Sequence, residues 1–191
     1  TGAVALLQVL RDGLDGVDGL DLVQTVIVSA GGRFVYAAGL ADDAIAIFER
    51  DTETGELAYL TAVENGLAGV TGLDGVRGLA MTPDGTFLFA TSYNDDAVAV
   101  FRRDGLTGLL AELQVAHDGI GDFAGLDGAR AIAVSPDGRD LYALGEYDDA
   151  IAVLTRVGQA SCGAGGESDI ADIVDLAVGG AQPGHQAAQD A

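Results

Sequence analysis

Aspartate is the residue type in this chain whose spacing points most clearly to a chemical role. Asp12, Asp15, Asp18 and Asp21 recur at every third position of the segment DGLDGVDGLD. Ca²⁺ binds several carboxylate and carbonyl oxygens on a bent backbone, and glycine permits such a bend. The segment therefore predicts a weak calcium site. A solvated connector between two strands is the alternative, because the segment has no EF-hand pattern.

A second set of aspartates forms adjacent pairs at Asp42-Asp43, Asp95-Asp96 and Asp148-Asp149. Each pair comes directly before a short apolar run. Aspartate side chains accept hydrogen bonds from nearby backbone N–H groups in turns. We therefore expect a structural role for these pairs, although a ring of acidic pairs on one face could also bind cations weakly.

The sequence contains no recognisable catalytic constellation, so no catalytic and no cofactor-binding residue is predicted. No Gly-x-Ser-x-Gly elbow is present, and neither His117 nor His185 has a second His or Cys at metal-ligand spacing. Cys162 is the only cysteine, which excludes a disulfide within the chain. Three arginines recur at the end of a predicted strand, where a salt bridge to an acidic residue is expected: Arg50, Arg103 and Arg156.

These residues belong to a repeat of 53 positions. The turn Ser29–Gly32 recurs as Thr82–Gly85 and again as Ser135–Gly138, and the aspartate pairs recur at the same spacing. An internal period of about 40 to 50 residues is typical of repeat folds such as propellers. The period therefore determines which elements must position the aspartates.

Four short strands are expected in each repeat. In the middle copy they cover Arg77–Thr82, Thr86–Thr91, Ala97–Arg102 and Leu109–Ala116. The runs are rich in β-branched and aromatic residues, and they are shorter than most helices. Four strands per repeat predict an all-β fold made of β-propeller blades.

The repeat resembles the lactonase-like, YVTN-type β-propeller family. The resemblance rests on the turn Ser135–Gly138, on Leu141-Tyr142, on the segment Asp148–Val153 and on the turn Arg103–Gly108. The motif Gly-Leu-Asp-Gly at 72–75 and 125–128 is also similar. The resemblance implies the propeller fold, and it raises the hypothesis of a lactonase-like hydrolase. Function is not fixed by such repeats, because one fold serves many activities.

The expected organisation is a propeller segment over residues 1–180 and a tail over 181–191. Repeats cover about 14–66, 67–119 and 120–180, and residues 1–13 add an extra N-terminal outer strand. Three blades do not close a ring. The end strands, Gly2–Leu10 and Ile170–Val178, are therefore expected to pair with another copy or with a larger parent propeller. The predicted interface residues are Val4, Leu6, Leu7, Val9, Ile170, Ile173 and Val174.

The charge of the chain excludes two classes of partner. Its net charge is −21, from 30 acidic and 9 basic residues, and every basic residue is arginine. Such a surface repels nucleic acid and anionic membranes. No apolar run reaches the roughly 20 residues that a membrane helix needs. We expect an extracellular, periplasmic or cell-surface location, in which salt could screen the acidic surface.

Three hypotheses of function follow. The preferred one is a non-catalytic structural or binding protein, a propeller scaffold that self-associates by strand complementation. The first alternative is a lactonase-like hydrolase of a sugar lactone, with this chain as part of a larger propeller. The second alternative is a calcium-dependent adhesion or matrix module.

Overall fold

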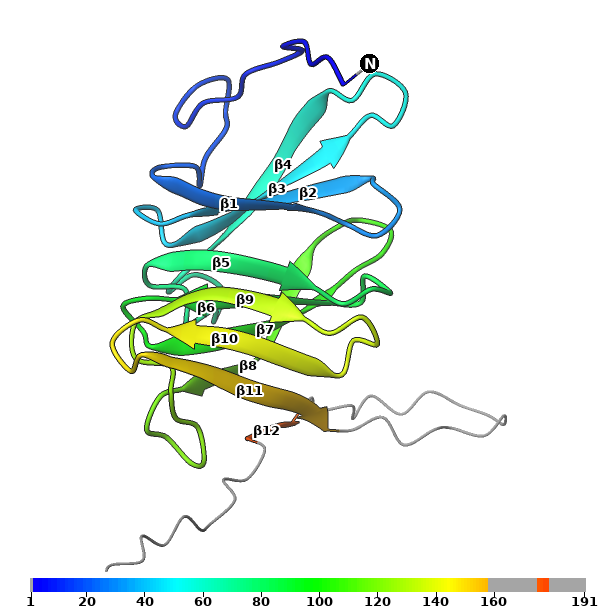
Figure 1. The fold of residues 1–191 in the computed structure, drawn as a ribbon. Coiled ribbons are helices and arrows are strands. Elements are labelled where there is room, and N and C mark those ends of the chain that lie inside the picture. The colour runs from blue at the N-terminus through cyan, green and yellow to red at the C-terminus, as the bar shows by residue number, and fades with distance from the viewer. Residues whose placement is uncertain (1, 158–174, 179–191) are drawn as a thin grey trace, which may run out of the picture.

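The fold is a stack of three antiparallel, four-stranded sheets (Figure 1). The structure is a computed structural model, and it describes residues 2–157 and the strand 175–178. Blade 1 contains β1 (Val23–Val28), β2 (Phe34–Gly39), β3 (Ala44–Arg50) and β4 (Leu57–Glu64). Blade 2 contains β5 (Val76–Met81), β6 (Phe87–Ser92), β7 (Ala97–Arg103) and β8 (Leu110–His117). Blade 3 contains β9 (Ala129–Val134), β10 (Asp140–Gly145), β11 (Ala150–Val157) and β12 (Asp175–Val178).

The turns of the repeat form because short polar side chains satisfy the backbone. The Ser135 hydroxyl accepts the N–H groups of Arg139 and Asp140, and Ser29 accepts that of Phe34 in blade 1. In the turn between β7 and β8, the Asp104 carboxylate accepts the N–H groups of Leu106 and Thr107. These bonds stabilise the turns in which the chain reverses between neighbouring strands.

The strands within each blade pair in sequence order, and their side chains alternate between the two faces of the sheet. In blade 2, Leu88 and Ala90 of β6 face blade 1, whereas Phe89 faces blade 3. All three side chains are fully buried. Burial on both faces explains why the second and third strands of blades 1 and 2 are apolar over most of their length.

The hydrophobic core lies between the blades. One cluster joins Phe34, Tyr36 and Ile45 of blade 1 to residues of blade 2, including Leu88 and Phe101. A second cluster of buried side chains joins blade 2 to blade 3. Its members include Phe89, Val98, Val100, Leu126, Leu141 and Leu154. Neighbouring blades therefore stabilise each other by packing sheet against sheet.

Polar contacts accompany this packing at the end of the blades where β1 and β2 are joined. The Tyr36 hydroxyl of blade 1 donates to the Gly108 carbonyl of blade 2 at 2.8 Å. Arg156 donates to the Gly138 carbonyl at 2.8 Å and lies over the Phe87 ring, 4.3 Å from its centroid. Arg103 makes the matching contacts with Gly85 and Phe34.

The expected salt bridges of Arg50, Arg103 and Arg156 are therefore a wrong prediction. Arg50 also donates to a glycine carbonyl, that of Gly32 at 3.3 Å. A guanidinium offers five donors and a flat face. All three arginines hold a turn by donating to a glycine carbonyl, and Arg103 and Arg156 also lie over an aromatic ring. The ion pairs of the described residues are Arg33–Glu49 and Arg130–Glu146.

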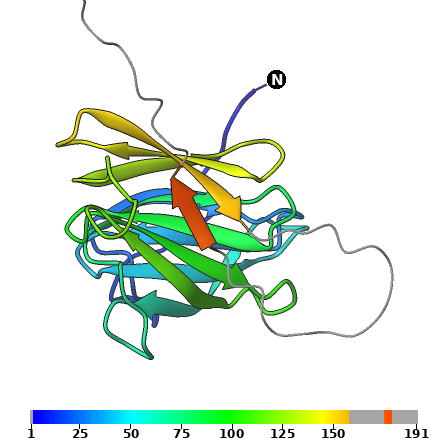
Figure 2. The same cartoon turned by 90° about the horizontal axis from the view of Figure 1, so that it is seen from below.

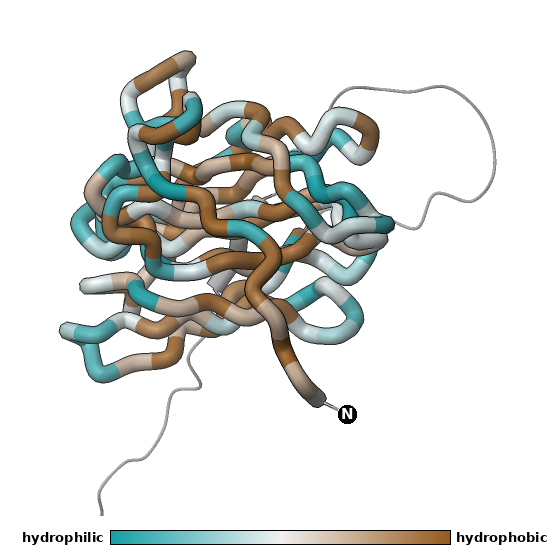
Figure 3. The backbone as a smooth tube through the Cα atoms, turned by 90° about the horizontal axis from the view of Figure 1, so that it is seen from above, coloured by the Kyte–Doolittle hydropathy of each residue, from teal (hydrophilic) through white to brown (hydrophobic). Residues whose placement is uncertain are grey.

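The N-terminal segment 2–10 forms no strand, so the extra outer strand predicted there is wrong. It passes over blade 1 as an apolar run of extended chain (Figure 3). The Gln8 side chain alone mimics a strand partner, because its amide donates to the Leu57 carbonyl and accepts the Leu57 N–H. Further along, Leu10, Val17 and Leu20 pack against blade 1 and cover part of its free face.

The other predicted end strand forms in part. β12 pairs with β11 in antiparallel register, from Leu154 opposite Val178 to Val157 opposite Asp175 (Figure 2). The remainder of the predicted range, with the interface residues Ile170, Ile173 and Val174, lies outside the described residues. The tail at 181–191 lies outside them as well.

No helix long and apolar enough to cross a membrane occurs in the part of the chain that the structure describes.

Candidate active site

A groove of about 370 Å³ crosses the first strands of all three blades. It is lined by Gln24 and Thr25 of β1, Arg77, Gly78 and Leu79 of β5, Arg130, Ala131 and Ile132 of β9, and Leu144 of β10. Each first strand is the free edge of its sheet, and β5 lies between β1 and β9. The innermost strands of a propeller surround its central channel. The groove is therefore the channel wall of this fold.

Two arginines at equivalent repeat positions give this wall a positive charge. Gln24, Arg77 and Arg130 are separated by 53 residues each and occupy the start of β1, β5 and β9. Gly78 keeps two of these strands close, because a Cβ at that position would lie 3.0 Å from the Cα of Ala131. Two guanidinium groups beside one groove are an anion-binding arrangement in a chain that is otherwise strongly acidic.

The partner of each wall arginine lies directly after the second strand of its blade, 16 positions later. Arg130 forms an ion pair with Glu146, with 2.8 Å between Nη1 and Oε2. At the equivalent position of blade 2, the Arg77 guanidinium lies over the ring of Tyr93, 4.0 Å from its centroid. The Nε atom of Arg77 is buried and has no hydrogen-bond partner among the described residues. Among the described residues, Arg77 forms no ion pair with a carboxylate, so no acidic partner neutralises its charge there.

The two tyrosines at this end of the blades link Arg77 to blade 3. The hydroxyl groups of Tyr93 and Tyr147 are hydrogen-bonded, and their rings contact each other at a centroid distance of 5.6 Å. The hydrogen bond with Tyr147 and burial raise the pKa of Tyr93, so its hydroxyl stays protonated at neutral pH. The site thus combines two cations, one carboxylate and two tyrosine hydroxyl groups.

The aspartate pairs lie at the same end of the blades and have divided roles. The first member bonds within its own blade, where Asp95 accepts the Asp74 N–H at 2.9 Å. The second member reaches the next blade, where Asp43 accepts the Gly75 N–H and Asp96 accepts the Gly128 N–H, both at 2.7 Å. These contacts give the pairs the structural role that the sequence predicts. They also join neighbouring blades, which the sequence does not reveal.

The structure brings together only two of the four aspartates of the predicted calcium segment. Oxygen atoms of Asp12 and Asp18 lie within 4.8 Å of each other and of Asp42, a member of the first pair. Asp15 and Asp21 are not part of this group. Burial raises the pKa of Asp42, and the neighbouring carboxylates of Asp12, Asp21 and Asp18 raise it further. Calcium binding remains a prediction.

The other singled-out residues do not converge on the groove. His117 Nδ1 lies 3.1 Å from the Asp95 carbonyl oxygen, which is a structural contact. Four predicted interface residues are exposed on the unpaired N-terminal segment: Val4, Leu6, Leu7 and Val9. Cys162 and His185 lie outside the described residues.

Sequence reasoning did not identify Arg77 and Arg130 as site residues, although a pattern in the repeat indicates them. Arg77 and Arg130 were visible as polar residues that begin two apolar strands at the repeat spacing. Their partners differ between the copies, with Leu40, Tyr93 and Glu146 at one repeat position. Positions at which the copies of a repeat diverge toward polar residues are the signal that identifies the site.

The comparisons define the class of protein. A family described as "Lactonase, 7-bladed beta-propeller" matches residues 1–120. The chain therefore belongs to the lactonase family of seven-bladed β-propellers, as the sequence resemblance predicts.

Particular relatives carry related names. The chain is 28% identical over 163 residues to a 6-phosphogluconolactonase of Pectobacterium carotovorum, covering 83% of this chain and 47% of that protein. It is also similar in fold to the periplasmic gluconolactonase of Pseudomonas aeruginosa, with a TM-score of 0.58, 24% identity and coverage of 82% and 42% of the two chains. A putative 6-phosphogluconolactonase of Bacteroides uniformis gives a TM-score of 0.59 at 20% identity, with coverage of 81% and 38%. The chain thus spans less than half the length of each of these proteins.

These relatives overturn the preferred hypothesis of function. The prediction of a non-catalytic, self-associating scaffold is wrong, because the relatives are named as lactonases. The first alternative, a lactonase-like hydrolase, agrees better with them. The lack of a contiguous catalytic motif does not exclude catalysis, because neighbouring blades can each contribute residues to one site.

Proposed function

We propose that the chain forms part of a lactonase that hydrolyses an anionic sugar lactone at the channel wall. The observation that carries this proposal is the position of Arg77 and Arg130 on neighbouring inner strands, with Glu146 held by one of them. Lactone hydrolysis needs a group that activates water and a group that stabilises the negative oxygen of the tetrahedral intermediate. The wall offers residue types for both tasks.

Each residue has a specific role in this proposal. Glu146 takes a proton from the attacking water and later returns it to the alkoxide that leaves when the ring C–O bond breaks. Arg130 orients the Glu146 carboxylate through their ion pair. Arg77, which lines the groove and forms no ion pair among the described residues, binds the carbonyl oxygen as it becomes negative or the anionic group of the sugar. Tyr93 supports the guanidinium by the cation–π contact.

A larger propeller is part of the same proposal. Seven blades surround a channel, whereas the three blades described here form one side of its wall. Further blades would close the groove and exclude water from it, which strengthens the electrostatic interactions of the two arginines.

Binding of a product analogue tests the charge of the wall. We expect 6-phosphogluconate to bind this chain more tightly than gluconate does in a calorimetric titration, because the phosphate adds negative charge. Arg77→Ala should weaken 6-phosphogluconate binding by about 10-fold or more, since a hydrogen bond to a charged group is worth roughly 1.5–3 kcal/mol.

The matched control is Arg139→Ala, which removes the same charge from an exposed residue at the opposite end of blade 3. It should leave the affinity unchanged. Equal losses in the two variants would show that only net charge matters, and the proposal would fail. In a closed propeller that contains this chain, Glu146→Gln should slow hydrolysis of the sugar lactone by about 100-fold or more, the contribution expected of a general base.

A further inference from the structure

Each first strand carries a β-bulge at the residue that lines the groove. The pairing of β1 with β2 shifts between Val23 and Thr25, so Gln24 has no residue directly opposite it. The same shift occurs around Arg77 of β5 and around Arg130 of β9. A bulge adds one residue to a strand and turns a side chain away from the direction that regular alternation would give it. The three equivalent positions therefore share a backbone irregularity as well as the repeat spacing.

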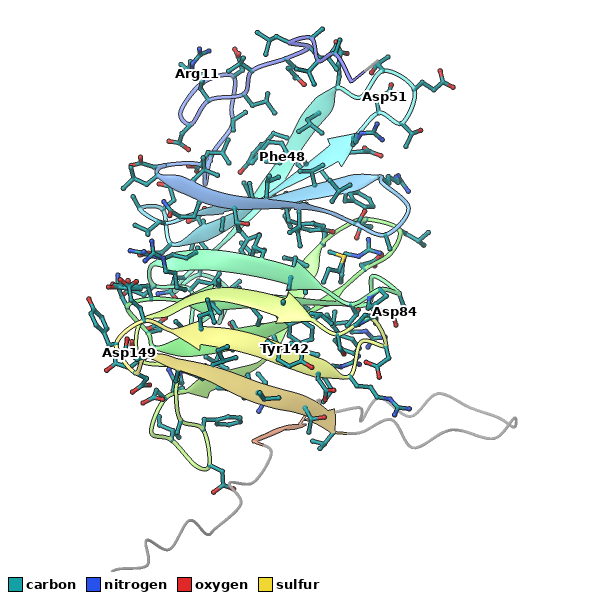
Figure 4. The ribbon with its side chains drawn as sticks, in the orientation of Figure 1. Arg11, Phe48, Asp51, Asp84, Tyr142 and Asp149 are labelled. Carbon is teal, nitrogen blue, oxygen red and sulfur yellow. The ribbon has the colours of Figure 1, made fainter. Side chains whose placement is uncertain are left out.

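Packing in β5 and β9 shows the effect of the bulge. Val76 and Leu79 both belong to the core between blades 1 and 2, although they are three positions apart. Ala129 and Ile132 have the same separation and both pack between blades 2 and 3. Residues three apart in a regular strand face opposite sides of the sheet. The bulge thus removes the arginine from the packed faces and places it along the groove, at the end of the blades where Asp149 lies (Figure 4).

The chemistry of the groove differs between the blades that line it. Blade 1 contributes Gln24 and Thr25, whereas blades 2 and 3 contribute Arg77 and Arg130. A carboxamide and a hydroxyl are uncharged, and each of them both donates and accepts hydrogen bonds, as the hydroxyl groups of a sugar do. A guanidinium only donates and is always charged, which favours carboxylate or phosphate. The groove therefore has a neutral side and a cationic side.

The Gln24 side chain is anchored beside the groove. Its Nε2 atom donates to the Leu22 carbonyl at 2.7 Å. An amide has two N–H groups and an oxygen, so this bond fixes the side chain and uses only part of its hydrogen-bonding capacity. The residue 16 positions later is Leu40, where blades 2 and 3 have Tyr93 and Glu146. Leu40 has neither a charge nor a polar group with which to engage the amide.

We propose that Gln24 determines specificity at the groove by hydrogen-bonding hydroxyl groups of the sugar, with Thr25 beside it, while Arg77 binds the anionic group. The inference rests on the proposed function and deepens it by orienting the ligand. The hydroxyl groups lie over blade 1, and the negative charge lies over blade 2. Selectivity for a hydroxylated anion over a bare anion then depends on one side chain that takes no part in the chemical step.

Two ligands separate the two sides of the groove. 6-Phosphogluconate carries hydroxyl groups and negative charge, whereas inorganic phosphate carries the charge without a sugar. Each is titrated into the isotope-labelled full chain, and binding is followed by NMR through the side-chain amide of Gln24 and the backbone amides of the groove. We expect Gln24→Ala to weaken 6-phosphogluconate binding by about 3- to 10-fold, the range of a neutral hydrogen bond, and to leave phosphate binding unchanged. Arg77→Ala should weaken both.

Gln8→Ala is the matched control, because Gln8 bonds the backbone of Leu57 in β4 and does not line the groove. It should leave both affinities unchanged. Gln24→Arg tests the position by a gain of binding, which a misfolded variant could not produce. It places a third guanidinium at the bulge, with Leu40 in place of an acidic partner. It should tighten phosphate binding by about threefold or more, since a charge-assisted hydrogen bond is stronger than a neutral one.

The outcomes distinguish this inference from the proposed function. If Gln24→Ala weakens both ligands equally or neither of them, the inference fails, although Arg77→Ala can still show that the groove binds anions. An unchanged phosphate affinity in Gln24→Arg would also overturn it, because the bulge would then not aim its side chain into the groove. If both ligands are insensitive to Arg77→Ala, or if neither ligand binds, the proposed function fails and the inference fails with it.

Discussion

Aspartates in this chain affect stability in opposite directions, depending on what their carboxylates contact. Hydrogen bonds from the N–H groups of Thr107 and Leu106 lower the pKa of Asp104. Burial and neighbouring carboxylates raise the pKa of Asp42 above its ordinary value. The folded state therefore favours the charged form of Asp104 and the protonated form of Asp42.

The sign of each effect follows from linkage. Because the pKa of Asp104 is lower in the folded state, its contribution is present at neutral pH and is lost as the pH falls below about 4. Asp104→Asn should therefore lower the free energy of unfolding at pH 7, and it should lower it less at pH 3. Chemical unfolding of both proteins at the two pH values measures this difference. An equal loss at both pH values would contradict the linkage.

Asp42→Asn should act in the opposite sense. The raised pKa means that the charged carboxylate destabilises the fold at neutral pH, and that this cost disappears as the pH falls through the raised pKa and below the unfolded value. The substitution should therefore raise the free energy of unfolding at pH 7, while its amide oxygen still accepts the Asp21 N–H. A loss of stability at pH 7 would show that the hydrogen bond outweighs the repulsion.

Among the strands, the same face of the sheet contributes unequally to stability in different blades, depending on whether a neighbouring blade covers it. Phe89 and Tyr142 occupy the same repeat position, but Phe89 is fully buried between blades 2 and 3 whereas Tyr142 is 41% exposed. Phe89→Ala should lower the free energy of unfolding by about 3–5 kcal/mol, the usual cost of deleting a buried aromatic ring. Urea unfolding measures it.

Tyr142→Ala is the internal control at the same scale. It should cost clearly less than Phe89→Ala, because part of the ring already contacts water. Equal costs in the two variants would mean that Tyr142 is buried in solution.

The strands also show what sequence reasoning can reach. The period of 53 and the turn residues located the three complete sets of inner strands, because turn chemistry and alternating burial are local properties. The segment 2–10 has the same composition but remains unpaired, since a strand requires a partner that its own sequence does not specify. The pairing of Arg77 and Arg130 beside one groove could not be predicted for a related reason, because it forms only when blades 2 and 3 lie side by side.

The whole molecule carries a charge that its own fold must tolerate. With a net charge of −21, repulsion among carboxylates opposes the compact state. The temperature of half-unfolding should therefore rise between 0.1 M and 1 M NaCl, as the screening length falls from about 10 Å to about 3 Å. Thermal unfolding followed by circular dichroism measures the shift.

A neutral osmolyte at the same osmolality is the control for this effect. It should not reproduce the full rise, because it does not screen charge. A midpoint that is unchanged or lower in salt would show that the acidic surface does not limit stability, and would remove the reason for expecting a salty habitat.

The glycine that donates to Asp96, Gly128, lies close to a side chain 19 positions later, and this proximity has an evolutionary consequence. A Cβ at Gly128 would lie 2.8 Å from the Tyr147 ring, and a Cβ at Gly75 would lie 2.9 Å from the Asn94 amide. In blade 1 the same position is Leu22, with a φ of 52°, and the residue 19 positions later is the small Ala41. The two positions share one volume, so a mutation at either is tolerated only after a compensating change at the other. Across homologous blades they should covary, with glycine accompanying a large partner and a larger residue accompanying alanine.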